Sequence, residues 1–157
     1  MKRLFKLAAL GLILSTSAMA ANNTMLQFTM KAISKDMTNV FYPSTQEPLD
    51  VTEEALVIAI ARARTAAYQL NLVIDKKDDE MLPAVLQGAS EQEKKEKLTL
   101  YSNYLKQAIE IVNLAEKQLL TERVKAPTER NFQAMIKTSE DIDSVIRAAH
   151  KVFNPQN

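Results

Sequence analysis

The stretch LTLYSNYLKQAIEIVNLAEKQL, residues 98–119, decides the fold class of this chain. Its apolar side chains recur at alternating intervals of three and four residues, which is the spacing of one face of an α-helix. Ser90 and Glu93 precede it with the spacing of a capping box, which predicts that the helix begins after Ser90. The face consists of Leu98, Tyr101, Leu105, Ala108, Val112, Ala115 and Leu119. A helix of this length with a single apolar face has to pack that face against other helices.

Three further segments carry the same helical spacing. The first spans residues 24–40 and ends ahead of Pro43, because proline disfavours helix in the residue before it. The second spans residues 50–74 and opens with an Asp-x-x-Glu capping box. The third spans residues 127–153 and opens on a proline, which suits the first position of a helix.

Four amphipathic helices with short connections predict an all-α fold, an antiparallel up-down-up-down four-helix bundle. The composition supports this, because the chain has only two glycines and a β-protein of this size needs more of them at turns. The longest connection, residues 76–90, has a charged break followed by an apolar patch that contains Pro83. We interpret it as an ordered flap over one end of the bundle, with a plain connector as the alternative.

Residues 1–20 have the pattern of a secretory signal peptide. A basic start, Met1-Lys2-Arg3, is followed by an apolar run that is too short to span a bilayer. Ala18-Met19-Ala20 is a small-x-small cleavage motif. We therefore expect cleavage after Ala20, a periplasmic location and a single domain over residues 21–157. No later stretch of the sequence is long and apolar enough to be a membrane helix.

The charge balance argues against a nucleic-acid partner. The first 20 residues hold three of the 20 basic residues and none of the 19 acidic ones, so the remainder has 17 basic and 19 acidic residues. A nucleic-acid-binding domain would show a basic excess instead. The chain contains no cysteine, so its core must stand without disulfides. We expect a monomer.

Most kinds of catalytic site are missing from the sequence. With no cysteine and one histidine, the chain lacks a thiol nucleophile, a His-Glu-x-x-His zinc motif and a Ser-His-Asp pattern. The Glu-x-x-His pairs of di-iron bundles are also missing, and Gly88 alone does not make a phosphate-binding loop. We therefore do not expect an enzyme.

One pair of residues offers a cofactor site. His150, the only histidine, lies roughly 5 Å before the end of the fourth expected helix, and Met30 lies roughly 9 Å into the first. In an antiparallel bundle these two helix ends meet at the same end of the molecule. A histidine nitrogen and a methionine sulfur form a known axial pair for haem iron. Without a Cys-x-x-Cys-His motif, such a haem would be held non-covalently.

Spacing alone leaves structural roles open for both residues. A methionine on a helical stripe is usually a core filler, because its flexible thioether fits irregular gaps. A histidine near the end of a helix is more often a surface group that the helix dipole stabilises. These are the commoner roles of such residues.

Three short runs resemble the cytochrome b562 family, the small periplasmic four-helix b-type cytochromes. They are TMKAI at 29–33, ARTAA at 63–67 and RAAHKVF at 147–153. The resemblance implies non-covalent haem b, with Met30 and His150 as axial ligands to the iron. It also implies electron transfer to and from redox partner proteins. The residues expected to line the cofactor are Ile33, Leu70, Tyr101, Tyr104, Ile146 and Arg147.

The chain departs from the family pattern beside the expected haem. The family has an arginine one turn before its histidine, where this chain has Ile146, and Arg147 is displaced by one residue. An aromatic residue precedes the family's histidine, where this chain has Ala149. The alternative interpretation is a periplasmic helical-bundle protein without haem, with an interaction or stress role.

Overall fold

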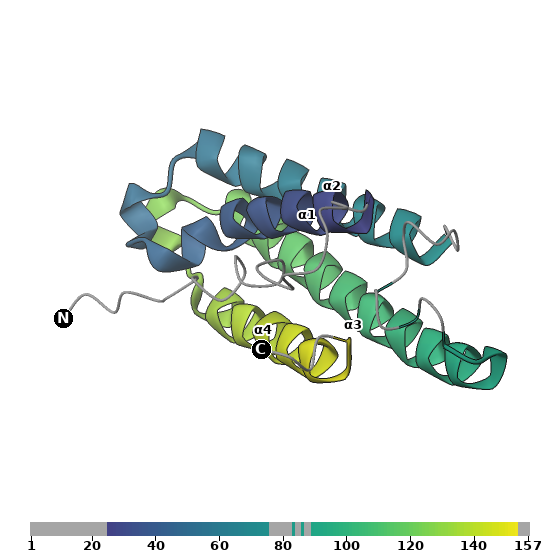
Figure 1. The fold of residues 1–157 in the computed structure, drawn as a ribbon. Coiled ribbons are helices and arrows are strands. Elements are labelled where there is room, and N and C mark those ends of the chain that lie inside the picture. The colour runs from purple at the N-terminus through teal and green to yellow at the C-terminus, as the bar shows by residue number, and fades with distance from the viewer. Residues whose placement is uncertain (1–24, 76–82, 84–85, 87–88, 154–157) are drawn as a thin grey trace.

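A computed structural model describes residues 25–75, 83, 86 and 89–153 (Figure 1). In this part of the chain every regular element is helical. The four α-helices are α1 (Met25–Phe41), α2 (Glu53–Asp75), α3 (Glu91–Arg123) and α4 (Gln133–Phe153). They pack in chain order with alternating direction, so the predicted all-α up-down-up-down bundle is confirmed. The expected signal peptide and most of the 76–90 connection lie outside the described residues.

The predicted apolar faces form the core of the bundle. On α3 the stripe is buried from Tyr101 to Leu119, and Leu98 at its start is half-buried. The stripe of α2 from Leu56 to Val73 is buried throughout. Small alanines in the middle of α2 let neighbouring helices approach closely, since they leave no long side chain between the backbones. None of the described helices has an apolar stretch long enough to cross a bilayer.

The capping box predicted for α3 is present. The Ser90 side chain accepts a hydrogen bond from the Glu93 backbone N–H, and the Glu93 carboxylate accepts one from the Ser90 backbone N–H. Hydrogen bonds from the Ser90 side chain and backbone, with the nearby charge of Lys97, lower the pKa of Glu93. These bonds satisfy two backbone donors that the start of a helix otherwise leaves unpaired.

The predicted start of the second helix was wrong by three residues. Asp50 ends a short 3-10 turn, Pro48–Asp50, and α2 begins at Glu53. The Thr52 hydroxyl accepts a hydrogen bond of 3.1 Å from the backbone N–H of Ala55, which is the bond that a capping side chain makes. Thr52 therefore takes the role that the sequence pattern assigned to Asp50.

The predicted start of the fourth helix was also wrong. Pro127 opens a 3-10 turn that ends at Glu129, and α4 begins only at Gln133. The reason lies in Glu122, a buried residue at the end of α3, whose carboxylate accepts a hydrogen bond of 2.6 Å from the backbone N–H of Asn131. That bond holds Asn131 in the loop after α3. The Oδ1 atom of Asn131 in turn accepts a hydrogen bond from the backbone N–H of Gln133, where α4 begins.

A buried arginine joins the two loops at one end of the bundle. Arg130 donates a hydrogen bond of 2.9 Å to the carbonyl of Val51 and lies 3.4 Å from the Glu53 carboxylate. We call this the loop end, formed by residues 42–52 and 124–132 (Figure 1). At the opposite end, the far end, α1 and α3 begin and α2 and α4 stop.

Two arginines of α2 hold its neighbours on either side. Arg62 pairs with the buried Asp36 of α1 at 3.1 Å, and Arg64 pairs with Glu116 of α3 at 2.6 Å. Residues two apart on a helix point to nearly opposite sides, so one helix reaches both neighbours. The pairs fix α2 between α1 and α3.

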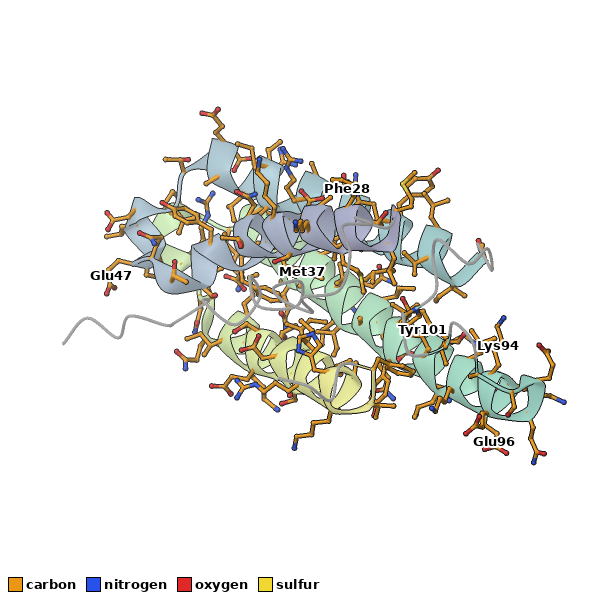
Figure 2. All side chains as sticks on the ribbon, viewed as in Figure 1. Phe28, Met37, Glu47, Lys94, Glu96 and Tyr101 are labelled. Carbon is orange, nitrogen blue, oxygen red and sulfur yellow. The ribbon has the colours of Figure 1, made fainter. Side chains whose placement is uncertain are left out.

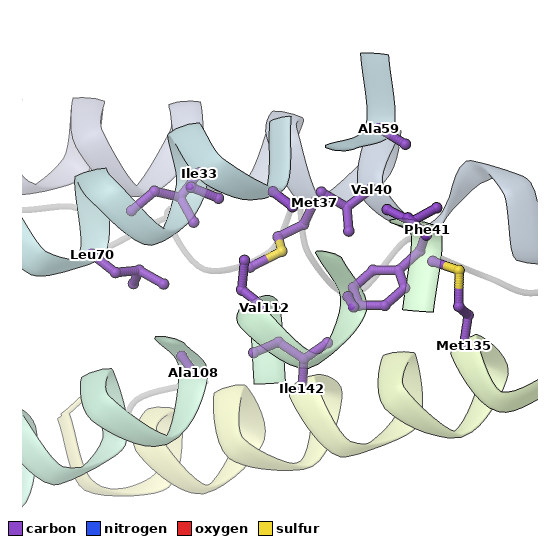
Figure 3. Packing of buried hydrophobic residues seen from close by; sticks show 14 of the residues in the cluster. Ile33, Met37, Val40, Phe41, Ala59, Leu70, Ala108, Val112, Met135 and Ile142 are labelled. Atoms are coloured by element: carbon purple, nitrogen blue, oxygen red, sulfur yellow. The ribbon is translucent and has the colours of Figure 1, made fainter. Parts of the chain in front are cut away.

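The core is packed more completely toward the loop end than toward the far end. Phe41, Met37 and Met135 are fully buried where α1, α3 and α4 converge (Figure 3). Toward the far end, Met30 of α1 and Phe153 of α4 pack on the core but remain half-buried. The helix α1 also contacts α4 far less than it contacts α2. At this end α1 and α4 therefore leave side chains half-buried, whereas Leu86 of the connection between α2 and α3 is fully buried.

Candidate functional site

Met30 and His150 lie at the far end of the bundle, as the antiparallel topology requires. Met30 is in the second turn of α1, half-buried, with its side chain packed against the core. His150 is in the last turn of α4 and is also half-buried. The two helices run in opposite directions, so the start of one and the end of the other share this end (Figure 1).

The imidazole of His150 is half-buried, and one of its two nitrogen atoms makes no hydrogen bond within the described residues. Its Nε2 atom is buried and has no hydrogen-bond partner among the residues that the structure describes. A buried polar atom without a partner costs about 1–3 kcal/mol, so such atoms are rare in native proteins. Burial also lowers the pKa of His150, which favours the neutral imidazole. The neutral ring is the form that binds a metal ion.

The lowered pKa of His150 predicts a pH dependence of stability in the free protein. Between the folded-state pKa and the unfolded value of 6.5, the unfolded chain binds the proton and the folded protein does not. The free energy of unfolding should therefore fall as the pH drops through about 6.5, with a slope of at most about 1.4 kcal/mol per pH unit.

Urea denaturation at several pH values from about 5 to 8 measures this slope, and His150→Ala should remove it. Other side chains seldom titrate in that range. A slope that persists unchanged in His150→Ala would contradict the prediction.

Three aromatic rings meet where α3 packs against the last turn of α4, the turn that also carries His150. The Phe153 ring meets the Tyr101 ring edge-to-face, with centroids 5.3 Å apart, and the Tyr104 ring at 6.3 Å. Tyr101 is buried, and its hydroxyl has no hydrogen-bond partner. Burial raises the pKa of the Tyr101 phenol, so the hydroxyl keeps its proton and can act as a donor.

The remaining residues predicted to line a cofactor fall into two groups. Ile33 and Leu70 are buried in the core, and Ile146 is half-buried against it. Arg147 instead lies outward, with 70% of its side chain exposed, at 3.4 Å from Asp143 one turn earlier. The fold thus brings Met30 and His150 to one end with the aromatic rings, and it directs Arg147 to the outer surface of α4.

Two features of this end were not identified from the sequence. Phe153 was not among the residues expected to line a cofactor, although its ring contacts the rings of Tyr101 and Tyr104. Gln69 of α2 has a buried side-chain oxygen, Oε1, that lacks a partner. The sequence does not indicate that the Gln69 amide is buried, because the burial of a polar side chain on a helix depends on the neighbouring helices.

A hollow of about 390 Å³ opens next to Tyr101, between the end of α2 and the start of α3. Val73 and Leu98 form its apolar wall, and Lys95 and Lys106 contribute positive charge. Tyr101 therefore lies between this hollow and Phe153 of α4. Within the described residues, no group of three or more histidine, cysteine or carboxylate side chains is placed to hold a metal ion.

Comparisons of the chain with protein-family models, with curated proteins and with solved structures find no match. What is established is a four-helix all-α protein, from its own helix order and packing.

Proposed function

We propose that this protein binds haem b non-covalently at the far end of the bundle and transfers electrons. His150 and Met30 would be the axial ligands of the iron. The observation that carries the proposal is the buried, unpartnered Nε2 atom of the only histidine. A coordinating metal would remove the energetic cost of leaving that atom without a partner.

The residues of this end fit such a group chemically. Burial favours the neutral imidazole of His150, whose lone pair is then available. The thioether of Met30 is a soft ligand that packs against the core at the start of α1. The rings of Tyr101, Tyr104 and Phe153 would provide an apolar wall that limits access of water.

When bound, haem supplies reversible one-electron chemistry at its iron, and a methionine ligand raises the reduction potential. The chain would contribute the two ligands, the apolar surroundings and an exposed edge at the end of the bundle. The redox partners would be other proteins that approach this end. No substrate would be transformed.

The far end has the packing expected of a site that accepts a flat cofactor. Met30, Ile146 and Phe153 are half-buried on the core, and α1 and α4 make few direct contacts. A cofactor placed between these two helices would bury the remaining exposed part of those side chains. That burial would contribute roughly 25 cal/mol per Å² of apolar surface.

Titration of the haem-free protein with haemin tests the proposal. We expect saturable binding at one haemin per chain, with a sharp Soret band and, after reduction, a resolved α-band. A protein that remains colourless through the titration, or that binds haemin only in proportion to the amount added, would falsify the proposal.

A second candidate function is supported by Arg147. In this structure its guanidinium is directed to the outer surface and faces Asp143, so it is not held beside a cofactor. This arrangement suits a haemless helical bundle that binds a partner protein in the exported compartment. Failure of the haemin titration would favour it.

A further inference from the structure

Buried polar atoms without partners are concentrated in one half of the bundle. The described residues contain four such side-chain atoms, and three of them belong to Gln69, Tyr101 and His150. These residues come from α2, α3 and α4, and all three lie toward the far end. The fourth atom, in Arg130, belongs to the loop end, where the same guanidinium makes other bonds. A ligand at the far end would therefore meet hydrogen-bonding groups as well as apolar rings.

We infer that the Tyr101 hydroxyl donates a hydrogen bond to a carboxylate of the bound porphyrin. This inference rests on the proposed haem binding. Haem b carries two carboxylate side chains, and they are its only strong hydrogen-bond acceptors. Tyr101 is 7% exposed and its hydroxyl has no partner among the described residues, so it is a buried proton donor at this end.

The direction of the Tyr101 side chain agrees with this role. Side chains on a helix lean toward its N-terminus, so Tyr101 lies over the preceding turn of α3, which contains Lys97. The contact of Tyr101 with Phe153 marks the level at which α4 ends, and the first turns of α3 project beyond it (Figure 1). Lys94 and Glu96 lie on this projecting part (Figure 2).

The projecting start of α3 carries three lysines and three glutamates, and one of the lysines, Lys97, lies one turn before Tyr101 and also acts on the Glu93 carboxylate. Lys97 is half-buried, one turn before Tyr101, so the two residues share a face of the helix. A carboxylate that leaves water needs a donor or an opposite charge to offset its desolvation. The Tyr101 phenol provides the hydrogen-bond donor, and Lys97 provides the opposite charge one turn away. A hydrogen bond from the phenol to a charged carboxylate is stronger than one between two neutral groups.

The test compares Tyr101→Phe with a control, Tyr68→Phe, which removes the hydroxyl of an exposed tyrosine on α2. Each variant is titrated with haemin and with haemin dimethyl ester, in which both carboxylates are blocked. We expect Tyr101→Phe to weaken haemin binding about tenfold or more and to weaken ester binding much less, because an uncharged ester carbonyl is a weaker acceptor than a carboxylate. Tyr68→Phe should bind both compounds like the unmodified protein.

A measurement without haem separates this role from a structural one. Because the hydroxyl has no partner in the free protein, Tyr101→Phe should unfold at the same or a higher temperature. Unchanged haemin binding by Tyr101→Phe would overturn the inference and leave haem binding intact. Equal weakening for haemin and its ester would also overturn it, since only packing would then be lost. If the unmodified protein binds neither compound, the proposed function fails and this inference fails with it.

Discussion

The variant His150→Ala should lose the haem spectrum almost completely. Changes in groups that merely support a metal ligand typically cost about 10–100-fold in affinity, and removal of a ligand itself should cost more than that. We therefore expect haemin affinity to fall by more than about 100-fold, with loss of the sharp Soret band and of the α-band in the reduced protein.

The same variant should fold normally, so a loss of the haem bands can be assigned to the missing ligand. His150 is half-buried, and its Nε2 atom makes no hydrogen bond that truncation would break. Its far-ultraviolet circular dichroism should match that of the unmodified protein. Retention of the haem bands by His150→Ala would show that the iron is held elsewhere.

The methionine ligand is tested by Met30→Leu. A leucine has nearly the volume of methionine, so this change costs less than about 1.5 kcal/mol in a packed site. We expect the variant to bind haemin through His150 alone, with a lower reduction potential than the unmodified protein. Met25→Leu is the matched control, because Met25 lies on the same helix and is exposed. Equal potentials in Met30→Leu and the unmodified protein would exclude Met30 as a ligand.

The largest effect on folding is expected for Phe41→Ala. The Phe41 ring is 1% exposed and packs near Met135 and Met37 where the helices converge (Figure 3). Removing it deletes the transfer free energy of the ring and leaves a cavity, which together cost about 3–5 kcal/mol. Small domains are typically stable by about 5–15 kcal/mol, so this variant should be close to unfolding.

The neighbouring Tyr42→Ala provides the control for this measurement. Tyr42 follows Phe41 directly, but 45% of it is exposed. Its replacement should cost less than about 1 kcal/mol, because surface substitutions remove little packing. Guanidinium denaturation of both variants gives the comparison. Similar losses of stability in the two variants would contradict the core that Figure 3 shows.

The helices and their buried faces could be predicted because the signal is local. Apolar residues spaced three and four apart define a face whatever the helix packs against, and the stripes from Leu56 to Val73 and from Tyr101 to Leu119 are buried as expected. The capping box at Ser90 is likewise formed within one turn of the chain. Such features need no knowledge of distant residues.

The starts of α2 and α4 could not be predicted from the same patterns. Asp50 and Pro127 both suit the beginning of a helix locally, yet each lies in a 3-10 turn. Contacts at the loop end decide the outcome, since Arg130 bonds Val51 and the Glu122 carboxylate takes the N–H of Asn131. Hydrogen bonds between segments that are distant in sequence leave no periodic signal.

The positions of Met30 and His150 within the bundle could be predicted. The antiparallel order of the helices sufficed to expect Met30 and His150 at one end, and the fold agrees with that placement. The exposure of Arg147 did not follow from its position, because it depends on which face of α4 the bundle leaves in contact with solvent; its pairing with Asp143 is a contact within one turn of the same helix. The ring contacts of Phe153 needed the packing of α3 against α4.

By itself the sequence determined an all-α chain of four amphipathic helices, because helical periodicity and caps are set by residues within a few positions of one another. Tertiary structure alone decided which polar groups have partners. Asp36 is buried but paired with Arg62, whereas the Nε2 atom of His150 and the hydroxyl of Tyr101 are buried without a partner. The physical reason is that burial and hydrogen bonding of a side chain are fixed by neighbours contributed from other helices.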